Sequence, residues 1–238
     1  MEVHHHAHTP GKKWTHYFWE FLMLFLAVFC GFLAEYQLEH TIEHQREKDY
    51  MQSMLEDLAL DTLEINRISS LNNTNAKYID TLLNTLRLPS VRDSSTRKKL
   101  YDFMTASMAG NLAVFTQRTL SQLKNAGGLR LIRKKEVANL ISLHDSKIQY
   151  LNVIAKSLDE TTTDATRVGS EIFDLNYYRV DHDHKYELIT YDPKIRKKFS
   201  NCAQIVQNVL FYYNDNLQDE KNVAIQLMQL IKKEYHLK

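Results

Sequence analysis

The chain has 238 residues, and 30 Lys and Arg against 29 Asp and Glu give a formal net charge of +1. This near-neutral balance provides no strong global field for recruiting nucleic acid. The composition, with only six glycines and three prolines, excludes collagen-like and Pro/Gly-rich disordered chains and argues against a β-sandwich. The two cysteines, Cys30 and Cys202, cannot form a disulfide framework.

The chain has one strongly apolar run near its N-terminus. From Tyr17 to Ala34 the only charged residue is Glu20, and aromatic residues flank the run, as is typical of a membrane interface. A helix of this length spans roughly 27 Å, close to a hydrocarbon core of about 30 Å. A secretory signal peptide, whose basic start Lys12 and Lys13 would fit, is the alternative interpretation. Because the run continues straight into a helical pattern, we predict an uncleaved transmembrane helix over residues 15–36.

The basic residues on the two sides of this run predict its orientation. Lys12 and Lys13 adjoin the run, whereas the next basic residue, Arg46, lies some three helical turns beyond it. The positive-inside rule then places a cytoplasmic tail at residues 1–14. Residues 37–238 are expected to form a helical domain on the other side, in the periplasm or the extracellular space.

The predicted transmembrane helix has two unlike faces. One face, which we expect to contact lipid, carries a stripe of phenylalanines: Phe18, Phe21, Phe25, Phe29 and Phe32. The opposite face contains pairs of small residues four positions apart, which allow two helix backbones to approach closely. Since the chain has only this one apolar run, we predict a homo-oligomer whose transmembrane interface is formed by Glu20, Met23, Ala27, Cys30, Gly31 and Ala34.

Glu20 lies on this small-residue face, one helical turn from His16. A carboxylate costs about 2.5–3.5 kcal/mol at the centre of a bilayer and less near an end. One interpretation is an ion or proton site formed by His16 and Glu20. The other is a carboxylate that reaches the headgroups or accepts a hydrogen bond within the oligomer. We favour the second, because Glu20 is close to the end of the apolar run.

Three further groups of histidines are candidate metal ligands. They are His4, His5, His6 and His8 in the tail, the pair His40 and His44, and the pair His182 and His184. A histidine-rich tail binds divalent metal weakly without a fixed scaffold, so a solvated tail is the simpler interpretation. Neither pair has a third ligand at the spacing of a metal motif, and we expect no cofactor.

Beyond Glu35 the apolar residues recur at the helical spacing i, i+3, i+4, i+7. We predict an all-α fold in which the transmembrane helix continues as a long helix to about Arg67, followed by an antiparallel helical bundle. The further helices are expected over residues 75–88, 94–108, 115–126, 133–166 and 194–238. Gly127 and Gly128 predict a hinge, where a left-handed glycine ends the preceding helix.

The chain contains no recognisable catalytic motif. Gly-rich phosphate loops, nucleophile elbows and paired zinc ligands are all missing from the sequence, which favours a non-enzymatic role. Six basic residues lie between Arg118 and Lys135. They could hold a phosphate or an anionic headgroup, but a solvated helix face is the simpler interpretation. The carboxylate nearest to His144 in sequence, Asp145, points away from it on a helix.

Two stretches of the chain carry a family resemblance. They are WEFLMLFLAVFCGFLAEYQLEH at Trp19–His40 and RTLSQLKNAGGLRLIRKKEVANLISLHD at Arg118–Asp145. Together they resemble a family of small bacterial single-pass membrane proteins that carry a domain of unknown function. The family's second motif is matched at Leu123, Asn125, Gly127 and Leu129–Ile132. The exit of the membrane helix departs from the family, with Glu39, His40 and Glu43 where relatives often have Asn and Trp. The resemblance implies a bacterial inner membrane and a periplasmic helical domain, and it implies no activity.

The sequence therefore predicts a non-enzymatic, single-pass membrane protein that forms a homo-oligomer and carries a helical scaffold or partner-binding domain. The expected partners are the lipid bilayer, further copies of the chain and another envelope protein, and not nucleic acid. One alternative is a small ion- or proton-conducting assembly with Glu20 near the pathway. Another is an enzyme or metal-handling protein that uses the histidine-rich tail.

Overall fold

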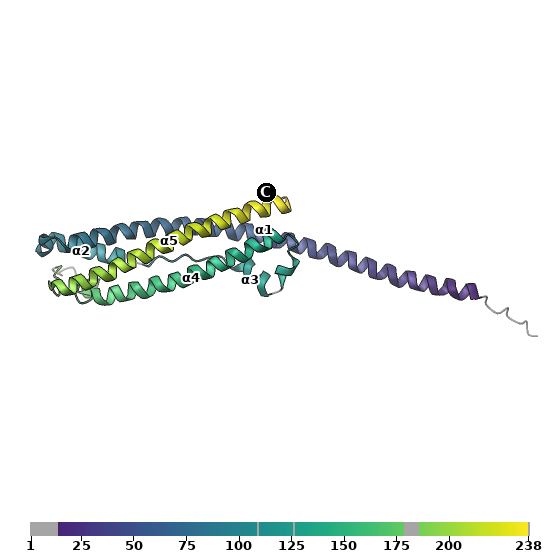
Figure 1. Cartoon of the computed structure of the whole chain (residues 1–238), viewed down its shortest axis with the longest axis horizontal. Helices are drawn as coiled ribbons and strands as arrows, with labels where there is room; N and C mark the ends of the chain where they lie inside the picture. The colour runs from purple at the N-terminus through teal and green to yellow at the C-terminus, as the bar shows by residue number, and fades with distance from the viewer. Residues whose placement is uncertain (1–13, 109, 126, 179–185, 238) are drawn as a thin grey trace, which may run out of the picture. The chain divides into compact units, whose positions relative to one another are not determined.

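A computed structural model describes residues 14–108, 110–125, 127–178 and 186–237. Its long elements are all helices (Figure 1): α1 (Trp14–Leu86), α2 (Ser94–Ser107), α3 (Arg118–Asn125), α4 (Lys135–Gly169) and α5 (Pro193–Tyr235). Short 3₁₀ helices lie at Pro89–Arg92, Gly128–Leu131 and Leu175–Tyr178. Within the described residues the only β-type pairing is an isolated bridge between Phe173 and Leu188. The predicted all-α class, with a long apolar N-terminal helix, is confirmed.

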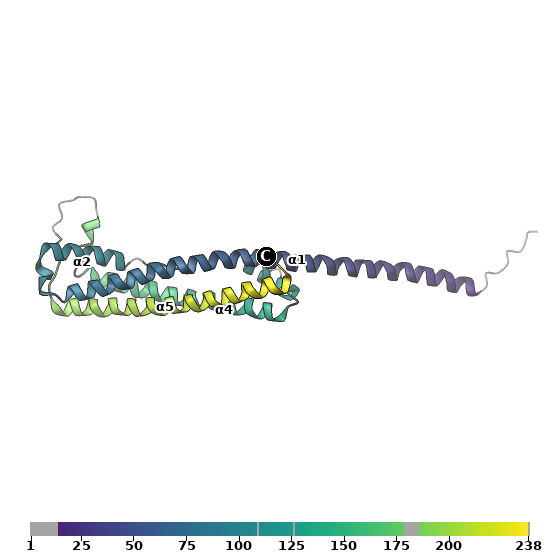
Figure 2. The ribbon, with the colours of Figure 1, turned by 90° about the horizontal axis from the view of Figure 1, so that it is seen from above.

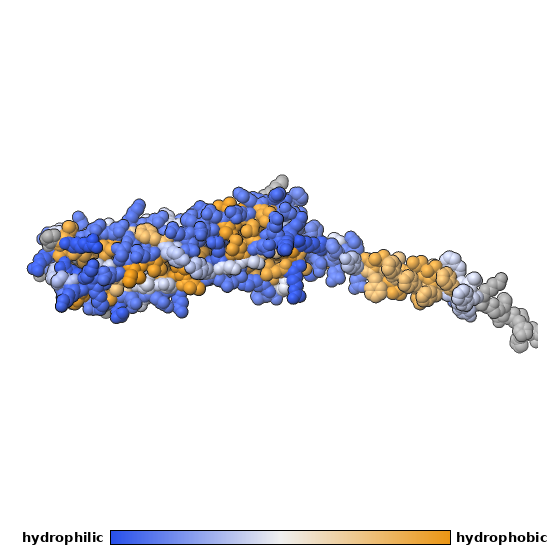
Figure 3. All heavy atoms as spheres, in the orientation of Figure 1, coloured by the Kyte–Doolittle hydropathy of each residue, from blue (hydrophilic) through white to orange (hydrophobic). Residues whose placement is uncertain are grey.

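The chain divides into two compact units, residues 1–49 and residues 50–238. In the first unit, α1 contains a window of mean hydropathy 2.0, none of which is buried by the rest of the described chain. Figure 3 shows hydrophobic residues covering the visible face of this part of α1. By length and composition the window can cross a membrane, a test that a signal sequence also passes.

Residues 67–75 do not interrupt α1, contrary to the sequence-based prediction of two separate helices. Asparagines in this stretch make contacts with α5. Asn72 Nδ2 donates to Asn214 Oδ1 over 3.1 Å, and Asn214 Nδ2 donates to Asn73 Oδ1 over 3.1 Å. Because these amides find partners on another helix, they do not compete with the backbone hydrogen bonds of α1.

The second unit contains long helices that contact each other along their lengths (Figures 1 and 2). Between α4 and α5, residue numbers rise along one helix as they fall along the other: His144 pairs with Glu220, and Tyr150 with Tyr212. The pairs between α1 and α5 follow the same trend, with Ser69 bonded to Gln218 and Asp80 to Gln207.

The core of the second unit is built from three groups of buried apolar side chains. One group joins Met51–Leu58 of α1 to α3, the start of α4 and the end of α5. A second group, around Tyr213, joins the middle parts of α1, α4 and α5. A third group, around Phe173 and Phe199, joins the end of α1 to α2 and the start of α5. Burial of apolar surface at roughly 25 cal/mol per Å² is the main force that holds these helices together.

The connection between α3 and α4 contains the left-handed glycine expected at the Gly-Gly pair. Gly127 has φ of +64°, and its carbonyl accepts a hydrogen bond from the Arg130 amide over 3.0 Å. Gly128 adopts an ordinary φ but is tightly packed, because an added Cβ would lie 3.2 Å from Leu123 Cα. The two glycines are therefore required for different reasons.

Substitution of these glycines by alanine should lower the free energy of unfolding. For Gly127→Ala we expect a loss of about 1 kcal/mol, from the left-handed backbone. For Gly128→Ala we expect destabilisation from the contact with Leu123. The matched control is Gly110→Ala, since an added Cβ there meets nothing within 4 Å. Denaturant unfolding of the full chain in detergent measures all three, and equal stability for Gly127→Ala and Gly110→Ala would contradict the assignment.

Candidate functional site

The apolar segment of α1 presents the side chains that the sequence analysis assigned to lipid and to an oligomer interface. The rings of Phe25 and Phe29 stack with centroids 5.8 Å apart on one face. On the other face, an added Cβ at Gly31 would meet nothing within 4 Å. His16 Nε2 lies 3.2 Å from Glu20 Oε1, and both side chains are about half exposed. This part of α1 therefore offers both of its faces to its surroundings.

The candidate metal ligands do not assemble into a site in the part of the chain that the structure describes. No group of three or more His, Cys, Asp or Glu side chains there could hold a metal ion. The His40 ring contacts Tyr36, with centroids 6.0 Å apart, and His44 Nδ1 lies 3.6 Å from Glu47. His4, His5, His6, His8, His182 and His184 lie outside the described residues.

The interior of the second unit contains an ionisable pair that the sequence analysis missed. His144 Nδ1 on α4 lies 2.5 Å from Glu220 Oε1 on α5, and the two side chains are 2% and 0% exposed. Burial raises the pKa of the Glu220 carboxyl, and the hydrogen bond with His144 opposes this rise. A buried charge is costly unless it is paired and hydrogen-bonded, so each of these two side chains depends on the other.

Asp61 adds a second buried carboxyl from α1. It is 1% exposed, and its Oδ1 accepts a hydrogen bond from the Thr116 amide over 2.7 Å. Burial raises the pKa of Asp61, while the contact with Thr116 and the nearby His144 lower it. Asp61, His144 and Glu220 thus bring titratable groups from three helices into one apolar interior.

The segment of residues 110–117, which we call the strap, is not helical, although a helix was predicted from Phe115. Side chains accept hydrogen bonds from its backbone amides: Tyr213 Oη from Ala113 over 3.0 Å, Glu64 from Val114 over 3.3 Å, and Asp61 from Thr116. Asp57 likewise accepts from Thr119 in the first turn of α3, over 2.9 Å. These side-chain acceptors take the place of the carbonyls that a helix would have supplied.

One sequence signal could have revealed the buried pair. His144 lies in the apolar stripe Val137, Ile141, His144, Ile148, Leu151 of α4, and Glu220 lies in the stripe Leu217, Glu220, Ala224, Leu227 of α5. An ionisable residue at a core position requires a partner. The stripes give no indication of which helix supplies it, because His144 and Glu220 are 76 positions apart.

The surface of the second unit also has an apolar groove between α4 and α5. The groove has a volume of about 320 Å³ and is lined by Tyr150, Val153, Ile154, Ser157, Asn208, Val209 and Tyr212. The hydroxyls of Tyr150 and Tyr212 lie 2.6 Å apart. Val153 is 65% exposed, so this apolar surface is open to solvent.

No protein-family model matches the chain, and no curated protein and no solved structure is significantly similar to it. Its function is therefore inferred from the residues and geometry described above.

The raised pKa values of the buried carboxyls predict that the contribution of Asp61 and Glu220 to the stability of the second unit falls as the pH rises. A carboxyl whose pKa is raised by folding favours the folded state at low pH, and this contribution is lost as the pH rises through the raised pKa. Glu220→Gln keeps a hydrogen-bonding group beside His144 without the ionisation. Relative to the wild type, this variant should gain thermal stability progressively as the pH rises above about 4.5, the ordinary Glu value.

The matched control is Glu234→Gln. Lys134, whose Nζ lies 3.0 Å from Glu234 Oε2, lowers the pKa of Glu234. The contribution of Glu234 to stability is present above the ordinary Glu pKa and is lost as the pH falls. Relative to the wild type, Glu234→Gln should therefore lose stability as the pH rises, which is the opposite of the change expected for Glu220→Gln. The loss should be small, because surface ion pairs contribute little to stability. Thermal unfolding followed by circular dichroism from pH 4 to pH 8 measures both. Identical pH profiles for Glu220→Gln and the wild type would contradict the prediction.

Proposed function

We propose that the chain is a single-pass protein of a bacterial inner membrane that self-associates through its membrane helix and carries a helical scaffold or binding module. The observation that carries this proposal is the apolar window of α1, with mean hydropathy 2.0 and no burial by the rest of the described chain. A helix that is hydrophobic all round and covered by nothing else in its own chain needs an apolar environment, which a bilayer supplies.

Self-association is supported by the unlike faces of this helix. Small residues at Ala27 and Gly31 permit close backbone packing between two helices, whereas the stacked rings of Phe25 and Phe29 suit contact with lipid. Because the apolar segment is a single helix, the simplest partner for its small-residue face is the same face of another copy.

We further propose that residues 50–238 form an antiparallel helical bundle, as the opposed numbering of the α4–α5 and α1–α5 pairs supports. The groove around Tyr150 and Tyr212 supports a binding role, because contiguous exposed apolar surface marks contact surfaces. The occupant that we assign to it is a second copy of the chain, since anchoring in one membrane assembly raises the effective concentration of the two bundles.

Exchange of single residues on the two faces tests the self-association. Gly31→Leu introduces a bulky side chain at the small-residue face and should reduce the fraction of cross-linked oligomer in membranes several-fold. Phe25→Leu, on the opposite face, is the control and should leave that fraction unchanged. Chemical cross-linking of the full chain in its native membrane gives the readout. Equal effects of the two variants would show that the faces are wrongly assigned.

Cysteine labelling of intact cells tests the membrane topology. In a background in which Cys30 and Cys202 are both replaced by serine, Asp219→Cys should react with a membrane-impermeant maleimide, because residues beyond the membrane helix are proposed to be periplasmic. The control, Glu2→Cys, should react only after the cells are lysed. The reverse pattern would overturn the proposed orientation, and labelling of neither cysteine in lysed membranes would show that the assay had failed to reach the protein.

A further inference from the structure

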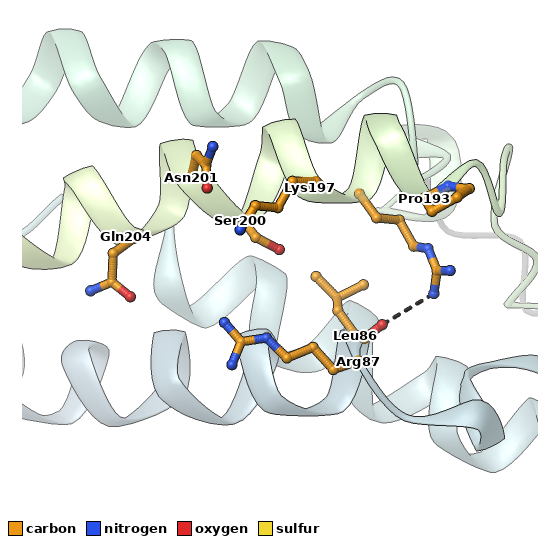
Figure 4. A pocket seen from close by; sticks show the side chains of 8 residues that line it. Leu86, Arg87, Pro193, Lys197, Ser200, Asn201 and Gln204 are labelled. Carbon is orange, nitrogen blue, oxygen red and sulfur yellow. Dashed lines mark hydrogen bonds between the residues drawn. The ribbon is translucent and has the colours of Figure 1, made fainter.

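A polar pocket lies between the end of α1 and the first turns of α5. It has a volume of about 450 Å³. Figure 4 shows Arg87 extending from α1 towards α5, with Lys197, Ser200, Asn201 and Gln204 along the opposite side. Pockets of about 300–1,000 Å³ are the usual size for small-molecule sites.

The lining of this pocket contains three cations and no carboxylate. The cations are Arg87, Arg196 and Lys197, and the neutral polar side chains around them are Ser200, Asn201 and Gln204. Among the described residues, neither Arg87 nor Lys197 takes part in a salt bridge. The nearest acid in sequence, Asp192, accepts a hydrogen bond from the Lys194 amide over 2.8 Å. In the described part of the chain the pocket lining is therefore basic, with the carboxylate of Asp192 at the neighbouring start of α5.

The basic residues between Arg118 and Lys135 provide a contrast, since they were the cluster singled out from sequence. Arg118 pairs with Asp57 at 2.7 Å, and Lys124 pairs with Asp145 at 2.9 Å. Folding thus pairs three of the six cations in this stretch, Arg118, Lys124 and Lys134, with carboxylates. Arg196 and Lys197 are adjacent in sequence, and folding brings Arg87 to them.

Arg196 is held in place by the fold rather than by an acid. Its Nη1 donates to the Leu86 carbonyl, at the end of α1, over 3.1 Å. Its Nε is buried and has no hydrogen-bond partner among the described residues. The guanidinium group is planar and presents several donors in a fixed fork, so the contact with Leu86 fixes the direction of the remaining donors.

Arg196 and Lys197 lie near the N-terminus of α5. The N-terminus of a helix carries a partial positive charge, which favours Asp and Glu in the first turn and disfavours Lys and Arg. The first turn of α5 contains no acidic residue, but the N-cap Asp192 places a carboxylate at this end, where it accepts a hydrogen bond from the Lys194 amide over 2.8 Å. Because Asp192 already caps the helix, an anion in the pocket would interact chiefly with the side chains of Arg196 and Lys197.

From this geometry we propose that the pocket binds a small ligand carrying a phosphomonoester group. Arg87 and Arg196 provide planar donors that match phosphate oxygens, and Lys197 adds a point charge. Ser200, Asn201 and Gln204 are placed to hydrogen-bond the remainder of a polar ligand. This inference is independent of the proposed membrane assembly, because every residue in it belongs to α1 and α5 of one chain.

Two sources could supply this chemistry, a soluble phosphorylated metabolite or a lipid headgroup. The experiment uses the purified full chain in neutral detergent and three probes: inorganic phosphate, glycerol 3-phosphate and short-chain dihexanoyl phosphatidic acid. Isothermal titration calorimetry at low ionic strength gives the Kd of each. Tighter binding of the phosphatidic acid than of glycerol 3-phosphate identifies a headgroup, and the reverse order identifies a soluble ligand.

The decisive variants are Arg87→Gln and Lys197→Gln, whose side chains are exposed. Each should raise the Kd of the preferred probe about tenfold, with the helical circular dichroism unchanged. The charge-matched control is Lys156→Gln, at an exposed position on α4, which should leave the Kd unchanged. The proposal is overturned if no probe binds the wild type, or if Lys156→Gln weakens binding as much as the pocket variants do.

Discussion

The helices of residues 50–238 are held in register by polar side chains that point into an otherwise apolar interior. Apolar contacts are non-directional, and by themselves they would allow one helix to slide along another. A broken hydrogen bond in this interior costs about 1–3 kcal/mol. Asn214 bonds to Asn72, Gln207 bonds to the Ala76 carbonyl, and His144 pairs with Glu220. Every shift of α5 against its neighbours would break these contacts, so the α5 surface determines where α1 and α4 lie.

The same contacts explain which parts of the fold could be predicted from the sequence. The helical spacing of apolar residues was sufficient for α2, α4 and α5, because burial of one face is a local pattern. It failed at residues 67–75 and 115–117, where the deciding partners are distant in sequence. The local conformations at Asn72 and Thr116 depend on hydrogen bonds to distant residues, since Asn72 bonds to Asn214 and Thr116 bonds to Asp61. The His144–Glu220 pair and the pocket around Arg87 depend on the packing of helices and not on any local motif.

Charge in this chain has two different structural roles. Some cations of α3 and of the residues just before α4 pair with a carboxylate of a neighbouring helix, as Lys134 does with Glu234 and Lys124 does with Asp145. Such exposed pairs contribute little to stability, at roughly 0–1 kcal/mol each. At the start of α5 the arrangement is different, because among the described residues Arg196 and Lys197 have no salt-bridge partner, and the carboxylate of Asp192 caps the helix instead. Net charge near zero therefore conceals a locally basic surface.

The strap has a consequence for how its sequence can vary. Its amides are bound by side chains of α1 and α5, so its path depends on acceptors that lie elsewhere in the chain. The Val114 side chain itself is 78% exposed. Most residue types at that position would preserve the path, whereas proline, which lacks the amide hydrogen, would not. The conformation of the strap is thus determined largely by the acceptors Glu64, Asp61 and Tyr213. A comparison of strap sequences alone would therefore underestimate how strictly that conformation is determined.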